Sequence, residues 1–176
     1  MIIRTLVAIA LGITFVLNGV YFYQAGRSDT DIDRRPDARM VRVYVLNPLN
    51  AADPRLGLPA AWEHATEGRG RLSLVARPDD ADAVIMVLPG DGDNFSWRIN
   101  ARQRAVVISV GSATVRRLGI SVVVHEIAHQ WCCDIGGVAD GHWLDDDEPG
   151  LMNASTHGYA QGLFSPRELR ALGLTE

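Results

Sequence analysis

The sequence predicts an α+β domain built on a small mixed sheet, and three observations support this fold class. Short apolar runs of strand length fill residues 40–110. A stretch whose apolar residues recur at helical spacing follows at 120–131, and the signals of a short capped helix stand near the end of the chain. Strand-rich and helix-rich regions that follow one another in this way are typical of α+β domains.

The predicted strands, in chain order, are residues 40–46, 72–77, 83–88, 95–99 and 105–110. The first alternates apolar and polar side chains, as a half-buried strand does. Residues 83–88 are almost entirely apolar, so we expect this strand at the centre of the sheet. The last two runs predict a hairpin across residues 100–104.

Two short helices and a long loop complete the predicted domain. Residues 59–66 form the first helix, which ends before Gly68. The final helix covers 166–172, with Ser165 as its N-cap and Gly173 as its terminator. Between the 120–131 helix and this final helix no periodic pattern is present, so the sequence predicts an irregular C-terminal loop there.

The first part of the chain has the composition of a membrane segment. Residues 5–23 are apolar apart from Thr5, Thr14 and Asn18, and about 20 apolar residues are enough to cross a bilayer. We therefore expect a transmembrane anchor or signal segment at 1–23. A polar linker at 24–38 and a domain at 39–176 follow. Either form of the segment places the domain outside the cytoplasm, membrane-anchored or secreted.

Length and charge limit the remaining possibilities. The 176 residues suffice for one folded domain beyond the membrane segment. The formal net charge is −4, and the basic residues, all of them Arg, are scattered along the chain, so nucleic-acid binding is not expected. Cys132 and Cys133 are adjacent and cannot join distant segments; we expect two small buried residues at a helix end.

The segment His125-Glu126-Ile-Ala-His129 carries the strongest chemical signal. Residues four apart lie on one face of a helix, so both imidazoles can bind a single Zn²⁺. Glu126 lies beside them, where it can take a proton from a metal-activated water. A catalytic zinc site needs a third protein ligand. The next histidine, His142, is our choice, because Gly136 and Gly137 let the chain turn back toward the metal.

Together these motifs resemble the metzincins, a clan of zinc peptidases. That clan has an HExxH helix, a third His after a glycine turn, and a methionine-bearing turn below the metal. Gly150-Leu-Met152-Asn resembles this Met-turn, and residues 165–173 resemble the closing helix of the clan. The sequence departs from the clan pattern at Cys132 and Ile135, where metzincins have Gly and His.

Other residues in the same region remain candidates for the third ligand. Glu148 follows His129 after eighteen residues, the spacing used by the gluzincin aminopeptidases, which His129-Gln-Trp131 also resembles. Oxygen ligands for zinc or for a structural Ca²⁺ are also available. These are Asp134, Asp140 and Asp145 to Asp147.

The sequence thus predicts a zinc-dependent peptidase, an endopeptidase, with Glu126 as general base and a protein or peptide as substrate. The resemblance implies that an extended substrate lies along an edge strand near 95–99, and His157 or Tyr159 can stabilise the oxyanion. Two alternatives stay open. One is a non-catalytic zinc-binding domain, and the other is a zinc amidase that acts on cell-wall or other amide bonds.

Overall fold

The computed structural model describes residues 36–47, 53–100, 102–132, 149–152 and 161–175. The chain divides into two compact units, 1–33 and 34–176, and the described residues belong to the second. None of the helices that these residues form has the length and apolar character needed to cross a bilayer. The predicted membrane segment at 1–23 lies outside the described residues.

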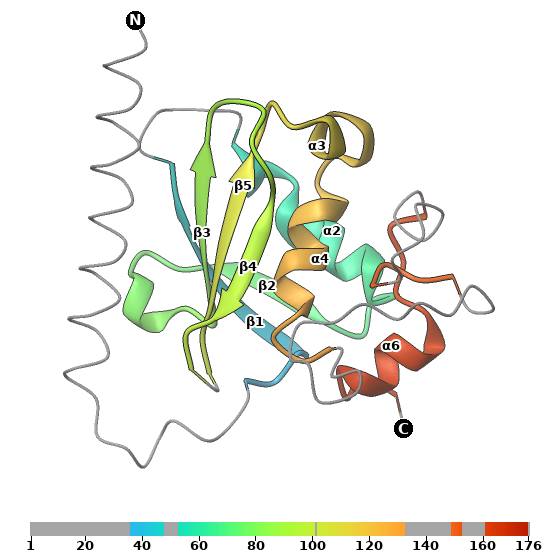
Figure 1. Ribbon diagram of the computed structural model, residues 1–176. Helices are drawn as coiled ribbons and strands as arrows, with labels where there is room; N and C mark the ends of the chain where they lie inside the picture. The colour runs from blue at the N-terminus through green and yellow to red at the C-terminus, as the bar shows by residue number, and fades with distance from the viewer. Residues whose placement is uncertain (1–35, 48–52, 101, 133–148, 153–160, 176) are drawn as a thin grey trace, which may run out of the picture. The chain divides into compact units, whose positions relative to one another are not determined.

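A five-stranded mixed sheet forms the centre of the domain, as the sequence predicts (Figure 1). Its strands are β1 (Met40–Leu46), β2 (Arg71–Leu74), β3 (Ala83–Leu88), β4 (Phe95–Arg98) and β5 (Arg104–Ser109). Their order is β2-β1-β3-β5-β4. All pairings are parallel except that of β4 with β5. The apolar strand β3 is central as predicted, and β4 forms one edge.

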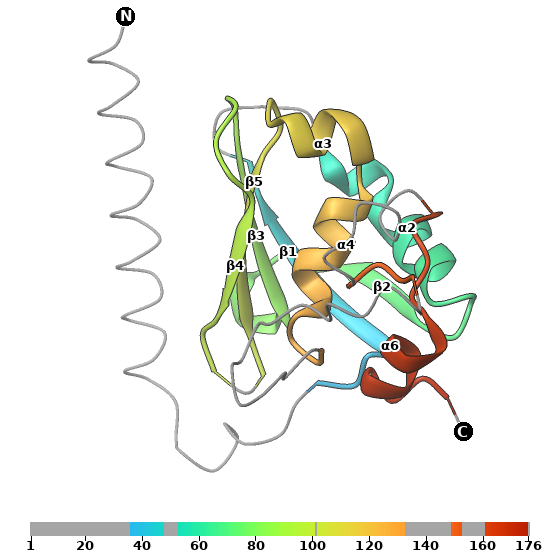
Figure 2. The same ribbon diagram turned by 45° about the vertical axis from the view of Figure 1, so that its right-hand side comes forward.

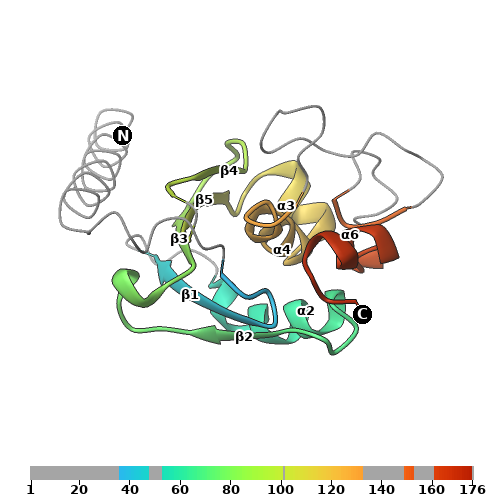
Figure 3. The same cartoon turned by 90° about the horizontal axis from the view of Figure 1, so that it is seen from below.

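The helices are α2 (Leu58–Ala65), α3 (Ala113–Leu118), α4 (Ser121–Ala128) and α6 (Pro166–Ala171), with short 3-10 helices at Pro54–Leu56 and Pro78–Asp80. Figure 2 shows α2, α3 and α4 on the same face of the sheet. The view from below in Figure 3 shows α4 between β5 and α6. The domain therefore has two layers, with α4 enclosed between the sheet and the C-terminal segment.

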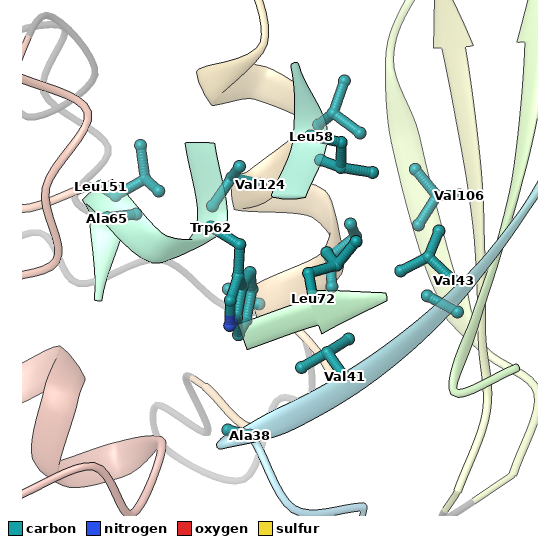
Figure 4. Close-up of a cluster of buried hydrophobic side chains, with 14 of the residues drawn as sticks. Ala38, Val41, Val43, Leu58, Trp62, Ala65, Leu72, Val106, Val124 and Leu151 are labelled. Carbon is teal, nitrogen blue, oxygen red and sulfur yellow. The ribbon is translucent and has the colours of Figure 1, made fainter. Parts of the chain in front are cut away.

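The core fills the space between these layers (Figure 4). Alternate side chains of the strands, such as Val43 and Val106, face Leu58 and Trp62 of α2. The Trp62 ring centroid lies 5.8 Å from that of Trp131 and 5.8 Å from that of Phe164. Burial of these rings joins α2, the end of α4 and the C-terminal segment.

The first described residues are packed into this domain. Ala38 is buried in the core, and the Pro36 carbonyl accepts a 2.6 Å hydrogen bond from Trp131 Nε1. The packed part of the chain therefore includes residues 36–38, ahead of the predicted boundary at 39. Trp131 is a core side chain.

Three elements differ from the sequence prediction by more than one residue at an end. The helix α3 was not expected, because none of its residues is buried and its apolar pattern is weak. Ser112 caps its start, and Gly119, with φ 58°, ends it in a conformation that favours glycine. The predicted helix 120–131 is shorter, since α4 ends at Ala128, and β2 ends at Leu74 instead of residue 77.

Candidate metal centre

The helix α4 carries the three residues of the HExxH motif into the interior. All its residues from Val122 to Ala128 are buried, as expected for a helix enclosed on every side. His129 follows directly as its C-cap, with helical φ −56° and ψ −12°. The exposed fractions are 1% for His125, 8% for Glu126 and 4% for His129.

The two imidazole rings face one another across one helical turn. Their Nε2 atoms lie 3.2 Å apart. The ring centroids are 4.7 Å apart, and the ring planes are nearly perpendicular at 86°. The rings therefore converge through the same type of nitrogen, as the four-residue spacing predicts.

The hydrogen bond made by Nδ1 of His125 determines the tautomer of that ring. Nδ1 lies 2.8 Å from the Leu151 carbonyl oxygen. A carbonyl can only accept, so Nδ1 carries the hydrogen and donates it. In the neutral ring Nε2 is then the atom with the lone pair. This arrangement orients metal-binding histidines in general, because the second nitrogen holds the ring and its tautomer.

The separation of the Nε2 atoms fits a shared zinc ion. Two nitrogens bound at about 2.05 Å to one tetrahedral Zn²⁺ lie about 3.3–3.4 Å apart. The observed 3.2 Å is close to this value. In metal-free protein the same distance allows a hydrogen bond from His129 Nε2 to His125 Nε2. The donor set of two buried imidazoles suits zinc better than Ca²⁺ or Mg²⁺, which prefer oxygen ligands.

The turn that contains Leu151 is held by the final helix. Leu151 and Met152 are fully buried, and the Met152 amide donates to Glu168 Oε1 at 2.7 Å. The Ser165 amide donates to Glu168 Oε2 at 2.8 Å, which completes the capping box of α6. A Cβ at Gly150 would collide with the same carboxylate. One buried side chain thus connects α6 to the turn beneath His125.

Glu126 is held from the sheet side. Ser96 Oγ on β4 donates to Glu126 Oε2 at 2.6 Å. Arg104 on β5, which is 0% exposed, donates from Nε to Ser96 Oγ at 3.0 Å. A second nitrogen of Arg104, Nη1, donates to the His129 carbonyl at 3.0 Å. The carboxylate and the end of α4 are therefore joined through one guanidinium.

The structure brings together His125, Glu126 and His129, and it places Met152 in the buried turn at His125. His142 lies outside the described residues, as do the alternative ligands and the oxyanion candidates, namely Asp134, Asp140, Asp145 to Glu148, His157 and Tyr159. In the described part of the chain, no three His, Cys, Asp or Glu residues are grouped to hold a metal. The third ligand stays a prediction.

The sequence prediction did not include Ser96, Arg104, the Leu151 carbonyl or Glu168. Ser96 and Arg104 belong to no motif. The Leu151 carbonyl and Glu168 lie in the segments that resemble the Met-turn and the closing helix, but the resemblance gives neither of them a role. One local signal existed: Ser165 with Glu168 three residues later forms a capping-box pattern.

Cys132, expected as a small buried residue, is buried and disulfide-bonded. The other cysteine of the chain, Cys133, lies outside the described residues.

No protein-family model and no curated protein matches this chain.

Proposed function

We propose that this protein is a zinc-dependent peptidase that hydrolyses peptide bonds, with Glu126 as general base. One observation carries the proposal. The Nε2 atoms of His125 and His129 converge to 3.2 Å, while Nδ1 of His125 is committed to the Leu151 carbonyl. A merely structural histidine pair has no need of an adjacent carboxylate, whereas a hydrolytic site does.

His125 and His129 hold the zinc ion through Nε2, and His142 is the proposed third protein ligand. Bound zinc supplies Lewis acidity, which polarises the scissile carbonyl and makes water more acidic. The buried walls around α4 keep both imidazoles in place and exclude bulk solvent from them. Low polarity there strengthens every charge interaction at the site.

Glu126 moves the proton in this proposal. Its carboxylate accepts a proton from the attacking water and returns it to the leaving amine. Ser96 donates to Oε2, which anchors one oxygen of this carboxylate. The turn of Leu151 and Met152 supports the same proposal, because it resembles the metzincin Met-turn and contacts the first histidine of the motif.

The proposed substrate is a protein or peptide in extended conformation, bound along β4. This strand is one of the two edges of the sheet in the described chain, and Ser96 on it contacts Glu126. Edge strands bind extended chains through backbone hydrogen bonds. Cleavage within a chain, by an endopeptidase, is consistent with a substrate that passes along the edge. We propose that residues 1–23 place this activity outside the cytoplasm, either anchored to a membrane or secreted.

The proposal is tested with Glu126→Gln in the full chain, purified in mild detergent. We expect the variant to keep about one zinc per chain and to lose casein hydrolysis by about 100-fold or more. The exposed Glu63 on α2 provides the matched control, and Glu63→Gln should retain full activity. Wild-type turnover by Glu126→Gln would refute the general-base role.

Assays of the wild-type chain distinguish the proposed peptidase from the two alternative functions. A wild-type chain that binds zinc but cleaves neither casein nor cell-wall fragments would be a non-catalytic zinc-binding domain. Cleavage of cell-wall fragments without cleavage of casein would identify an amidase.

A further inference from the structure

Two residues outside the HExxH motif connect its carboxylate to its second histidine. Ser96 and Arg104 lie on adjacent antiparallel strands, where Ser96 is paired with Val106 and Arg104 is two residues before it. Both side chains therefore project from the same face of the sheet, toward α4.

The direction of each hydrogen bond in this connection is fixed by chemistry. A guanidinium only donates, so Ser96 Oγ accepts from Arg104 Nε. The serine hydroxyl has one hydrogen, which it gives to Glu126 Oε2. At 2.6 Å this contact has the length of a hydrogen bond to an ionised carboxylate. The serine therefore presents its hydrogen to Glu126 in one orientation.

Arg104 also fixes the end of the helix. The last carbonyl groups of a helix have no hydrogen-bond partner within the helix. A cation at this end interacts favourably with the negative end of the helix dipole. Arg104 Nη1 donates to the carbonyl of His129, the C-cap of α4. Burial of an arginine costs free energy unless its N–H groups have hydrogen-bond acceptors. Ser96 Oγ and the His129 carbonyl are such acceptors for Arg104. The planar guanidinium holds two acceptors at a set separation, which lysine cannot do.

We propose that Ser96 and Arg104 are positioning residues that hold Glu126 and His129 in fixed relation for hydrolysis. This inference rests on the proposed function. In this role both side chains act through Glu126 and the end of α4, and neither needs to contact substrate or metal. Their removal should therefore lower kcat with little effect on KM or on zinc content.

The test uses the full chain with Ser96→Ala and Ser96→Thr. We expect Ser96→Ala to lower kcat by about 10- to 100-fold, with KM within about twofold of wild type. Zinc content should stay unchanged, and Ser96→Thr, which keeps the hydroxyl, should recover most of the activity. Arg104→Lys should show the same loss of kcat. If that variant does not fold, the Ser96 variants decide the question.

Two further measurements separate positioning from a general structural role. In a Glu126→Gln background, Ser96→Ala should change the remaining kcat by less than about twofold. In the metal-free chain, Ser96→Ala and Glu126→Gln should each shift the midpoint of urea unfolding. The shift of the double variant should differ from the sum of these two shifts. Ser109→Ala, which removes a buried hydroxyl bonded to the Asp93 carbonyl, is the control and should leave kcat unchanged.

The outcomes distinguish this inference from the proposed function. Unchanged kcat in Ser96→Ala, alongside an inactive Glu126→Gln, would overturn the positioning role and leave the peptidase proposal intact. Additive effects of Ser96→Ala and Glu126→Gln would overturn it as well. An active Glu126→Gln would remove the proposed function itself.

Discussion

At the scale of single residues, the site depends on the different roles of the two ring nitrogens of His125. His125 donates from Nδ1 to a backbone carbonyl, Leu151 O, which no side-chain substitution removes. Its Nε2 is thereby directed at His129. Pre-orientation of this kind lowers the entropy lost when ligands close on an ion.

The tautomer of His125 is a direct prediction of this geometry. In metal-free protein at neutral pH, long-range proton–nitrogen NMR spectra should show His125 protonated on Nδ1. The exposed His64 on α2 is the internal comparison. A spectrum with His125 protonated only on Nε2 would mean that the Leu151 contact does not form.

At the scale of elements, three parts of the fold converge on α4. The edge strand β4 and its neighbour β5 hold Glu126 and the helix end. The final helix α6 reaches the other side through Glu168, whose carboxylate accepts from the Met152 and Ser165 amides. One buried carboxylate therefore links the turn at His125 to the start of α6.

Replacement of Glu168 should consequently affect both stability and metal binding. We expect Glu168→Ala to lower the free energy of unfolding by roughly 2–4 kcal/mol, because two buried amides lose their acceptor. Zinc affinity should fall as well, since the Leu151 carbonyl is no longer held in place. Urea unfolding of metal-free chain and equilibrium dialysis with zinc measure the two effects.

The matched control for this prediction is Glu63→Ala. Glu63 is an exposed helical glutamate, so its loss should change stability by no more than about 0.5 kcal/mol. Equal effects of the two substitutions would contradict the role given to the Glu168 carboxylate.

At the scale of the whole molecule, much of the architecture could be predicted from local sequence. The predicted bounds of β1 and β3 agree with the structure, and those of β4 and β5 differ by one residue. Alternation and strongly apolar runs are local signals, and they are clear in these strands. The helix α3 gave no such signal, because it buries no residue. Strand order was not predictable, since it depends on contacts between distant segments.

The candidate site also has a part that local sequence predicts and a part that it does not. His125, Glu126 and His129 are adjacent in one motif, so their convergence follows from helical periodicity alone. Ser96 and Arg104 reach α4 only because the β4–β5 hairpin packs against that helix, and no spacing rule contains this information. The position of Met152 beside the site followed from family resemblance and not from its own sequence context.

Metal removal should destabilise the folded domain as a whole. A ligand that binds only the native state adds about 2.7 kcal/mol at a free concentration of 100 times Kd. For a chain of this size, chelation of zinc should therefore lower Tm by about 5–10 °C, and added zinc should restore it. Calorimetry with and without EDTA measures the shift. The His125→Ala variant should show no chelator effect, and an equal shift there would place the stabilising ion elsewhere.

The most direct test of the proposed zinc site is X-ray absorption at the zinc edge, on the full chain loaded with one equivalent of zinc. We expect nitrogen ligands at about 2.0–2.1 Å with the scattering signature of imidazole. That signature should weaken in His125→Ala and in His129→Ala, but not in His64→Ala. A chain that binds no zinc, or a spectrum that neither substitution changes, would contradict the account.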